Sequence, residues 1–243
     1  MRRQNIISIL FIFVLILCCN DNFGIQDTNR YDYLLYLPKS YSEDSLKNWP
    51  LIIFLHGASL RGNDLEKIKK FGIPNLIEQG KKFPFLIISP QLPTKKRWST
   101  DNWLDTLFVE VTVKYRIDPD RIYLTGLSLG GEGTWHIAEK YSDKFAAIAP
   151  ICGRTSYIPD IREEVNKIKH LPIWVFHGAK DRVIPIEESE TMVKLLRKYN
   201  SNVKFTVYQD LGHGETHKKA YNDEELYIWF LSKNRKNNLF IKP

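Results

Sequence analysis

One stretch, residues 121–131, constrains the fold of this chain more than any other. A β-branched and aromatic run ends there in Gly-x-Ser-x-Gly, and a segment compatible with a helix, residues 132–140, follows. The order of strand, glycine-flanked serine and helix predicts a sharp turn that presents the serine hydroxyl above the edge of a sheet. The N-terminus of the following helix also offers an amide N–H to a developing oxyanion. Ser128 is therefore the predicted nucleophile.

Buried strands and helical segments alternate along the rest of the chain. The expected strands cover residues 31–37, 51–55, 85–89, 121–125, 145–149, 172–176 and 203–208. The expected helices cover residues 65–79 with a break near Gly72 and Pro74, a segment ending near Tyr115 and capped by Thr100 or Asp101, and residues 132–140, 158–169, 187–199 and 215–232. This alternation predicts a doubly wound, mostly parallel sheet with helices on both faces.

The chain length predicts one domain. Its 243 residues, 43% of them hydrophobic, are sufficient for a single large core. We expect that domain to cover residues 31–233, with a C-terminal tail at residues 234–243.

Two further residues follow strands in the order that a serine nucleophile requires. Serine reacts well only when a base takes its proton, and the base needs an acid to fix its tautomer. In a sheet of this kind the acid and then the histidine follow the serine, each on a loop after a strand. Asp181 follows the strand at residues 172–176, and His213 lies in a glycine loop after the last strand. His217 competes as the base, but it should fall inside the terminal helix.

The remaining candidate site residues are two backbone donors and two tryptophans. The buried strand at residues 51–55 runs into His-Gly-Ala, a turn that typically lends backbone amides to acyl-transfer sites. The N–H groups of Ala58 and Leu129 are the predicted oxyanion donors. Trp98 and Trp135 are candidate substrate-binding residues that would stack on a sugar or phenolic ring, with core packing as the alternative.

Composition and spacing exclude several other functions. The formal charge is +7, but Lys and Arg are interspersed with Asp and Glu, so we expect no nucleic-acid partner. No group of His, Cys, Asp and Glu has metal-ligand spacing, and we expect neither a metal nor a cofactor. Cys152 is the one cysteine beyond the N-terminal segment, which predicts a buried, inert thiol. His177 is expected to pack at a strand end.

The N-terminus predicts export. Residues 1–19 combine Arg2 and Arg3 with an apolar run that is too short to span a bilayer comfortably. The end of this run resembles a bacterial lipobox, so a lipidated Cys18 or Cys19 would attach the protein to a membrane; plain secretion and an uncleaved anchor are the alternatives. Residues 20–30 would form a short tether, and the expected location is the periplasm or the cell surface.

Taken together, the motifs resemble the α/β-hydrolase superfamily. More narrowly, they are similar to exported bacterial esterases related to phospholipase/carboxylesterase, polyhydroxybutyrate-depolymerase-type and feruloyl-esterase-type proteins, some of them described as predicted peptidases. The resemblance rests on residues 54–58 with 61–64, 89–91 with Trp98, 126–131 with 133–135, 150–153, 177–181 and 212–213.

The resemblance implies a fold and an activity. The fold would be the α/β-hydrolase fold, and the family triad would fall on Ser128, Asp181 and His213, the residues that the strand positions also indicate. The implied activity is hydrolysis of carboxylic esters through an acyl-enzyme, on short acyl or aryl esters such as those of plant polysaccharides. An exported serine peptidase with the same triad and a non-catalytic binding protein on this scaffold are the alternatives.

Overall fold

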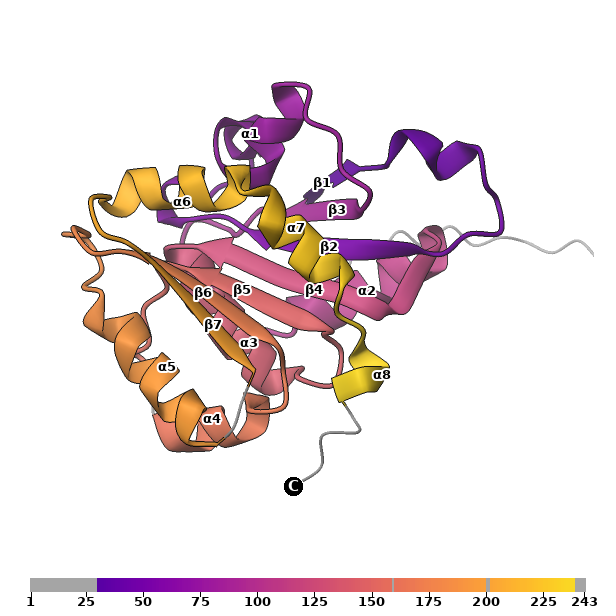
Figure 1. Cartoon of the computed structure of the whole chain (residues 1–243). Coiled ribbons are helices and arrows are strands. Elements are labelled where there is room, and N and C mark those ends of the chain that lie inside the picture. Colours follow the sequence, from indigo (N-terminus) through magenta and orange to yellow (C-terminus); the bar gives the residue numbers. More distant parts are fainter. Residues whose placement is uncertain (1–29, 159, 200–201, 239–243) are drawn as a thin grey trace, which may run out of the picture.

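A seven-stranded sheet forms the centre of the structure, a computed structural model that describes residues 30–158, 160–199 and 202–238. The strand order is β1-β3-β2-β4-β5-β6-β7 (Figure 1). Only the edge pair β1–β3 is antiparallel, so the predicted mostly parallel sheet is confirmed. The strands are β1 (Tyr33–Tyr36), β2 (Trp49–Leu55), β3 (Leu86–Pro90), β4 (Ile117–Leu127), β5 (Ala147–Ile151), β6 (Ile173–Gly178) and β7 (Val203–Tyr208).

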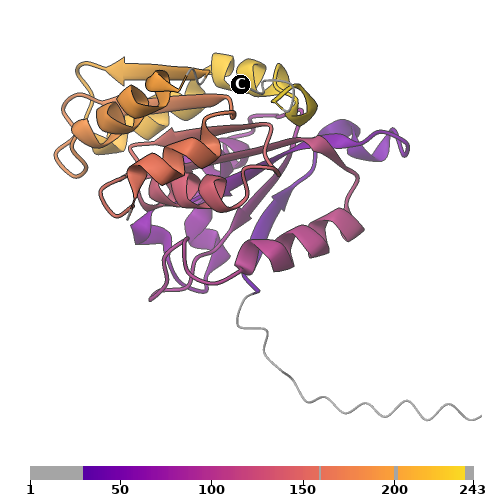
Figure 2. The same cartoon turned by 90° about the horizontal axis from the view of Figure 1, so that it is seen from below.

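Helices cover both faces of the sheet. Helices α1, α6 and α7 pack on one face, and α2 to α5 pack on the other, which Figure 2 shows from below. The α-helices are α1 (Gly72–Glu78), α2 (Trp103–Lys114), α3 (Leu129–Lys140), α4 (Ile161–Ile168), α5 (Glu187–Lys198), α6 (His213–Asn222), α7 (Glu224–Leu231) and α8 (Arg235–Asn238). Short 3₁₀ helices cover Lys39–Ser42, Ala58–Leu60 and Leu65–Lys70. None of the described helices combines the length and apolarity that a membrane crossing requires.

The alternation of side chains along each strand divides the core into two layers. In β2, Leu51 and Ile53 contribute to the cluster under α2 to α5, whereas Ile52 and Phe54 contribute to the cluster under α1, α6 and α7. Successive side chains of a strand point to opposite faces, so a strand covered on both sides is apolar at every position. Every residue of β2 is buried.

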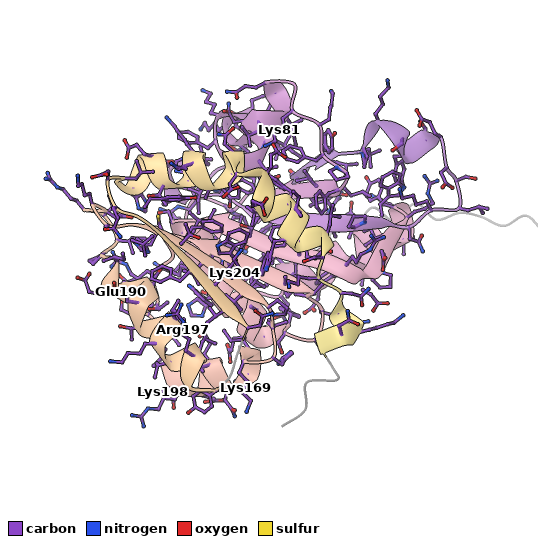
Figure 3. The ribbon with its side chains drawn as sticks, in the orientation of Figure 1. Lys81, Lys169, Glu190, Arg197, Lys198 and Lys204 are labelled. Atoms are coloured by element: carbon purple, nitrogen blue, oxygen red, sulfur yellow. The ribbon has the colours of Figure 1, made fainter. Side chains whose placement is uncertain are left out.

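Helix α5 shows how a covering helix divides its faces. Met192 and Leu196 are fully buried against the sheet, whereas Glu190, Arg197 and Lys198 are exposed and point outward (Figure 3). This pattern is that of an amphipathic helix on the surface of a globular domain. The basic side chains of this face are therefore part of a solvated surface with acidic neighbours.

The predicted terminal helix at residues 215–232 is wrong as a single element. The structure has two helices there, because Asp223 interrupts the first and its carboxylate accepts the Glu225 N–H at 3.0 Å as the N-cap of α7. Helix α6 also begins earlier than expected, at His213, so this residue lies on the first turn of a helix with Gly212 as its N-cap.

Two other expected boundaries differ from the structure. Neither Thr100 nor Asp101 caps α2; its N-cap is Asn102, and Asp101 has a positive φ of 64°. The predicted tail contains α8, which is attached to β4 because Arg235 Nη2 donates to Asp120 Oδ1 at 2.9 Å. The folded domain therefore extends beyond residue 233.

The chain reverses its direction across the sheet between β2 and β4. After β2 it moves outward to β3, and it then returns to place β4 on the other side of β2. The loops that leave the carboxyl ends of β2 and β4 therefore lie side by side, since Leu55 is paired with Gly126 in the parallel register. Sites in open α/β sheets form in the crevice at such a switch point.

Gly130 permits the close approach of α3 to the end of β2. A Cβ at this position would lie 2.0 Å from the Leu55 carbonyl oxygen, a clash with backbone that a side-chain rotation cannot relieve. We expect Gly130→Ala to lower the free energy of unfolding by about 1–3 kcal/mol or more, because the helix must move off the sheet. Urea denaturation measures the effect.

Gly214 provides the matched control for this substitution. Nothing lies within 4 Å of a Cβ built at Gly214. Gly214→Ala should therefore change the free energy of unfolding by no more than about 0.5 kcal/mol. An equal, small change in both variants would contradict the packing argument for Gly130.

Candidate active site

Ser128 lies on the turn between β4 and α3 in a strained conformation. Its φ and ψ are 56° and −117°, a region that non-glycine residues rarely adopt. Backbone hydrogen bonds hold it there: the Ser128 N–H donates to the Ile151 carbonyl, and the Glu132 N–H donates to the Ser128 carbonyl, both at 2.9 Å. The surrounding structure thus imposes the strain, as is common at functional sites. The side chain is held at the carboxyl edge of the sheet.

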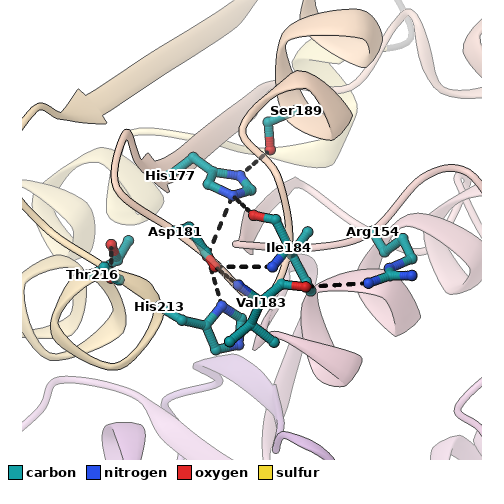
Figure 4. Close-up of polar contacts among 9 residues, drawn as sticks. Arg154, His177, Asp181, Val183, Ile184, Ser189, His213 and Thr216 are labelled. Carbon is teal, nitrogen blue, oxygen red and sulfur yellow. Dashed lines mark hydrogen bonds and ion pairs between the residues drawn. The ribbon is translucent and has the colours of Figure 1, made fainter.

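The loops after β6 and β7 are joined by backbone hydrogen bonds. Ala179 N–H donates to the Tyr208 carbonyl and Lys180 N–H donates to the Leu211 carbonyl, each at 3.0 Å. This pairing brings together two of the predicted site residues. His213 Nδ1 lies 2.6 Å from Asp181 Oδ2, as the dashed line in Figure 4 shows.

Asp181 is held as a carboxylate. Its side chain is fully buried, and its Oδ1 accepts the N–H groups of Val183 at 2.8 Å and Ile184 at 2.9 Å. Burial alone would raise the pKa of this carboxyl, but the hydrogen bonds from Ile184, His213 and Val183 outweigh it and hold the pKa below its usual value. Asp181 is therefore ionised near neutral pH and can orient a histidine.

The bond to Asp181 determines which tautomer of His213 is present. A carboxylate only accepts, so Nδ1 carries the proton and Nε2 keeps its lone pair. The imidazole is 20% exposed, which leaves Nε2 accessible from the sheet edge. Among the described residues, no hydrogen bond joins His213 to the Ser128 hydroxyl. Asp181 and His213 are thus hydrogen-bonded to each other, and Ser128 lies at the same edge of the sheet without a hydrogen bond to either side chain.

The loop after β2 is fixed by His56. Leu92 N–H donates to His56 Nε2 at 3.0 Å, so Nδ1 carries the proton and donates to the Gly57 carbonyl at 2.7 Å. Burial lowers the pKa of His56 to about 4, which keeps the ring neutral as this bonding pattern requires. A Cβ built at Gly57 would lie 3.6 Å from Ser128 Cβ. The loop therefore passes directly beside the serine.

Two amides at this junction have no acceptor. Within the described part of the chain, neither the Ala58 N–H nor the Leu129 N–H donates a hydrogen bond to another protein group. Ala58 begins a short 3₁₀ helix, and Leu129 begins α3, so both belong to the unpaired first turn of a helix. Such amides are suited to an oxyanion, which is the ligand that the sequence predicts for them.

The prediction that Trp98 and Trp135 bind substrate is wrong. Their exposed fractions are 1% and 0%, so neither ring offers a face to a ligand. Trp98 instead donates its indole N–H to the His56 carbonyl at 3.1 Å and packs its ring 5.0 Å from the imidazole. Trp98 therefore packs beneath the loop after β2 as part of the core. Trp135 of α3 belongs to the same core cluster.

His177 has a closer relation to the site than its sequence position indicates. Its Nε2 lies 2.9 Å from the Ile184 carbonyl and 3.4 Å from Asp181 Oδ2, and Nδ1 lies 2.7 Å from the Ser189 hydroxyl (Figure 4). Because a carbonyl only accepts, Nε2 carries the proton and Ser189 donates to Nδ1. His177 thus fixes the loop that bears Asp181. The His-Gly dipeptide that precedes this loop is the one local signal of that role.

Cys152 completes the surroundings of Asp181. The thiol is buried, and burial together with the neighbouring Asp181 charge raises its pKa far above the usual value. Potential ligand atoms of Cys152, His177 and Asp181 lie within 4.8 Å of one another, although the sequence showed no metal-ligand spacing. The His177 and Asp181 atoms already hydrogen-bond within the protein, and the thiol keeps its proton, whereas metals bind the thiolate. The group acts here as a hydrogen-bonded support of the carboxylate.

The chain is similar in sequence and in fold to known esterases. A family model described as phospholipase/carboxylesterase matches residues 98–222. A crystal structure of a thermostable esterase is 29% identical and superimposes with a TM-score of 0.70, covering 83% of this chain and 59% of that one.

Two curated relatives have similar sequences. A bifunctional acetylxylan esterase/xylanase from Neocallimastix patriciarum is 27% identical over 73% of this chain. A probable feruloyl esterase C from Aspergillus terreus is 27% identical over 68% of it. The chain spans 25% of the length of the first relative and 60% of the length of the second.

Proposed function

The chain belongs to the phospholipase/carboxylesterase family of α/β-hydrolases, and from this premise we propose that it is a serine hydrolase of carboxylic esters. The observation that carries the proposal is the bonded pair of Asp181 and His213 at the edge where the strained Ser128 lies. A nucleophile, a base and an orienting acid are the three groups that acyl transfer by serine requires. The esterase names of the relatives support the same reaction.

The proposed reaction proceeds through an acyl-enzyme. Ser128 Oγ attacks the ester carbonyl while His213 Nε2 takes the hydroxyl proton, and Asp181 stabilises the imidazolium. The tetrahedral oxyanion is bound by the free N–H groups of Ala58 and Leu129. Its collapse breaks the ester C–O bond, and His213 returns the proton to the departing alcohol. Water then repeats the sequence on the acyl-enzyme, which releases the carboxylic acid and restores Ser128.

The proposed substrates are short acyl or aryl esters of the kind found on plant polysaccharides. This extension rests on the names of the two curated relatives, an acetylxylan esterase/xylanase and a feruloyl esterase. Such substrates are too large to enter a cell, which agrees with an exported protein. Export, with a lipid on Cys18 or Cys19, is proposed from residues 1–19, which lie outside the described residues.

A substrate panel tests the reaction class. We expect turnover of p-nitrophenyl acetate and of methyl ferulate or acetylated xylan, and no comparable turnover of aminoacyl p-nitroanilides. Faster hydrolysis of the anilides than of the esters would instead indicate the serine peptidase. No turnover of any member, with a folded protein, would indicate the non-catalytic binding protein.

An active-site probe tests the nucleophile without a substrate. A fluorophosphonate should label the protein covalently, and peptide mass spectrometry should find the phosphonyl group on Ser128. Incubation with EDTA should leave ester hydrolysis unchanged, because the proposed steps need no Lewis acid. Activity lost in EDTA and restored by zinc would contradict this mechanism.

A further inference from the structure

A cation without an acidic partner lies beside the candidate active site. Arg154 follows β5 by three residues, and β5 pairs in parallel with β4, so Arg154 lies above the same sheet edge as Ser128. The preceding residue, Gly153, packs against the first turn of α3: a Cβ on Gly131 would lie only 2.9 Å from Gly153 Cα. The loop that carries Arg154 is therefore in direct contact with the helix that follows the serine.

This loop is fixed from its other side by Glu188 of α5. The Glu188 carboxylate accepts the Thr155 N–H at 2.8 Å and the Ser156 N–H at 2.7 Å. The Thr155 hydroxyl, which is buried, also donates to the Glu188 main-chain carbonyl at 2.9 Å. A binding side chain is most effective when such contacts hold its backbone in place. Arg154 is thus presented on a preorganised loop.

The guanidinium of Arg154 reaches the loop that bears the acid. Its Nη2 donates to the Val183 carbonyl at 3.3 Å, and the Val183 N–H donates to Asp181 Oδ1 (Figure 4). A guanidinium has five N–H donors, and this bond uses one of them. Among the described residues, no carboxylate forms an ion pair with Arg154. Most of its hydrogen-bonding capacity and its charge are therefore left for a ligand.

Its neighbour Arg97 differs in this respect. Both guanidinium groups lie against the ring of Tyr157, Arg97 at 4.8 Å and Arg154 at 5.5 Å from the ring centre. Arg97 Nε, however, donates to the carboxylate of Glu132 at 3.0 Å, and that side chain is only 6% exposed. The charge of Arg97 is neutralised within the protein, whereas that of Arg154 is not.

We propose that Arg154 binds a carboxylate of the substrate, so that this site prefers esters whose alcohol or acyl part is acidic. The inference rests on the proposed esterase function and assigns a substrate class to the same site. Guanidinium and carboxylate groups match in a planar, two-bond geometry, and such a pair is stronger than a neutral hydrogen bond. Arg154 and Ser128 follow the neighbouring parallel strands β5 and β4, so both lie at the same edge of the sheet.

Matched pairs of synthetic esters test this preference. One pair, 4-acetoxybenzoate and 4-acetoxybenzamide, has or lacks the carboxylate in the alcohol part. The other, mono-p-nitrophenyl adipate and p-nitrophenyl hexanoate, has or lacks it in the acyl part. Arg154→Gln should lower the ratio of kcat/KM for the acidic ester to that for the neutral ester by about tenfold in one pair, the size expected for a charged hydrogen bond at a partly exposed site. The pair that responds identifies the acidic part.

Arg182→Gln is the matched control, because it removes the same charge from an exposed position next to Asp181. The ratio of kcat/KM for the acidic ester to that for the neutral ester should remain within about twofold of wild type in this variant. Salt screens the long-range attraction between an exposed charge and the ester. An unchanged ratio in Arg154→Gln, or an equal fall in both variants, would overturn the proposal for Arg154. Failure of the wild-type protein to hydrolyse any of the esters would instead contradict the proposed function.

Discussion

Replacing Ser128 by alanine is expected to lower kcat for p-nitrophenyl acetate by about a million-fold. The oxygen that attacks the ester is removed, and loss of a triad serine has typically had an effect of this size because the remaining groups act only together with it. The measurement is steady-state kinetics on enzyme produced without contact with wild-type protein, since a trace of it would exceed the residual rate.

The fold of the Ser128→Ala variant should be unaffected. Alanine retains the Cβ, so the positive φ of 56° imposes the same strain, and the hydroxyl makes no hydrogen bond with the described residues. Urea denaturation should therefore give a midpoint close to that of wild type. Turnover within about tenfold of wild type in a folded variant would mean that another residue is the nucleophile.

Replacing His213 by alanine should have an effect of similar size, about a million-fold in kcat. Without Nε2 no group remains to take the serine proton, and the carboxylate of Asp181 loses its 2.6 Å partner. The residual kcat/KM of this variant should no longer decrease at acid pH. That decrease reports protonation of the general base, which must be neutral in the free enzyme. Asp181 does not replace this pH dependence, since its pKa is held below the usual value.

His217→Ala separates the base from its neighbour on α6. His217 is buried, which lowers its pKa, and its ring packs at 6.1 Å from that of Phe71. We expect this variant to lose about 1 kcal/mol or more of stability through the cavity it leaves, but to keep kcat/KM within about tenfold and to retain the acid-side decrease. If His217→Ala instead removed the activity and the acid-side decrease while His213→Ala kept both, His217 would be the base.

The elements of the fold could be predicted from the sequence because they depend on local patterns. Apolar runs of strand length, such as residues 51–55, indicate buried parallel strands, and Gly-x-Ser-x-Gly between a strand and a helix indicates the turn at Ser128. The same reasoning located Asp181 and His213 after the ends of strands, because the end of a strand is visible in its sequence, although His213 lies on the first turn of α6 and not in a loop. Their roles in catalysis remain a proposal that the two substitutions above test.

Contacts between distant segments were decided by the tertiary structure. The sequence left Trp98 as either a ligand-binding or a core residue. Its burial and its hydrogen bond to His56, 42 positions away, show that it belongs to the core. Arg154 has no local pattern that indicates its contact with the loop of Asp181, and the His-Gly dipeptide at His177 does not show which groups its ring contacts. Periodicity shows which side of an element is apolar. Which residues bury a side chain, and whether a charged side chain has an ion-pair partner, depend on how strands and loops assemble in three dimensions.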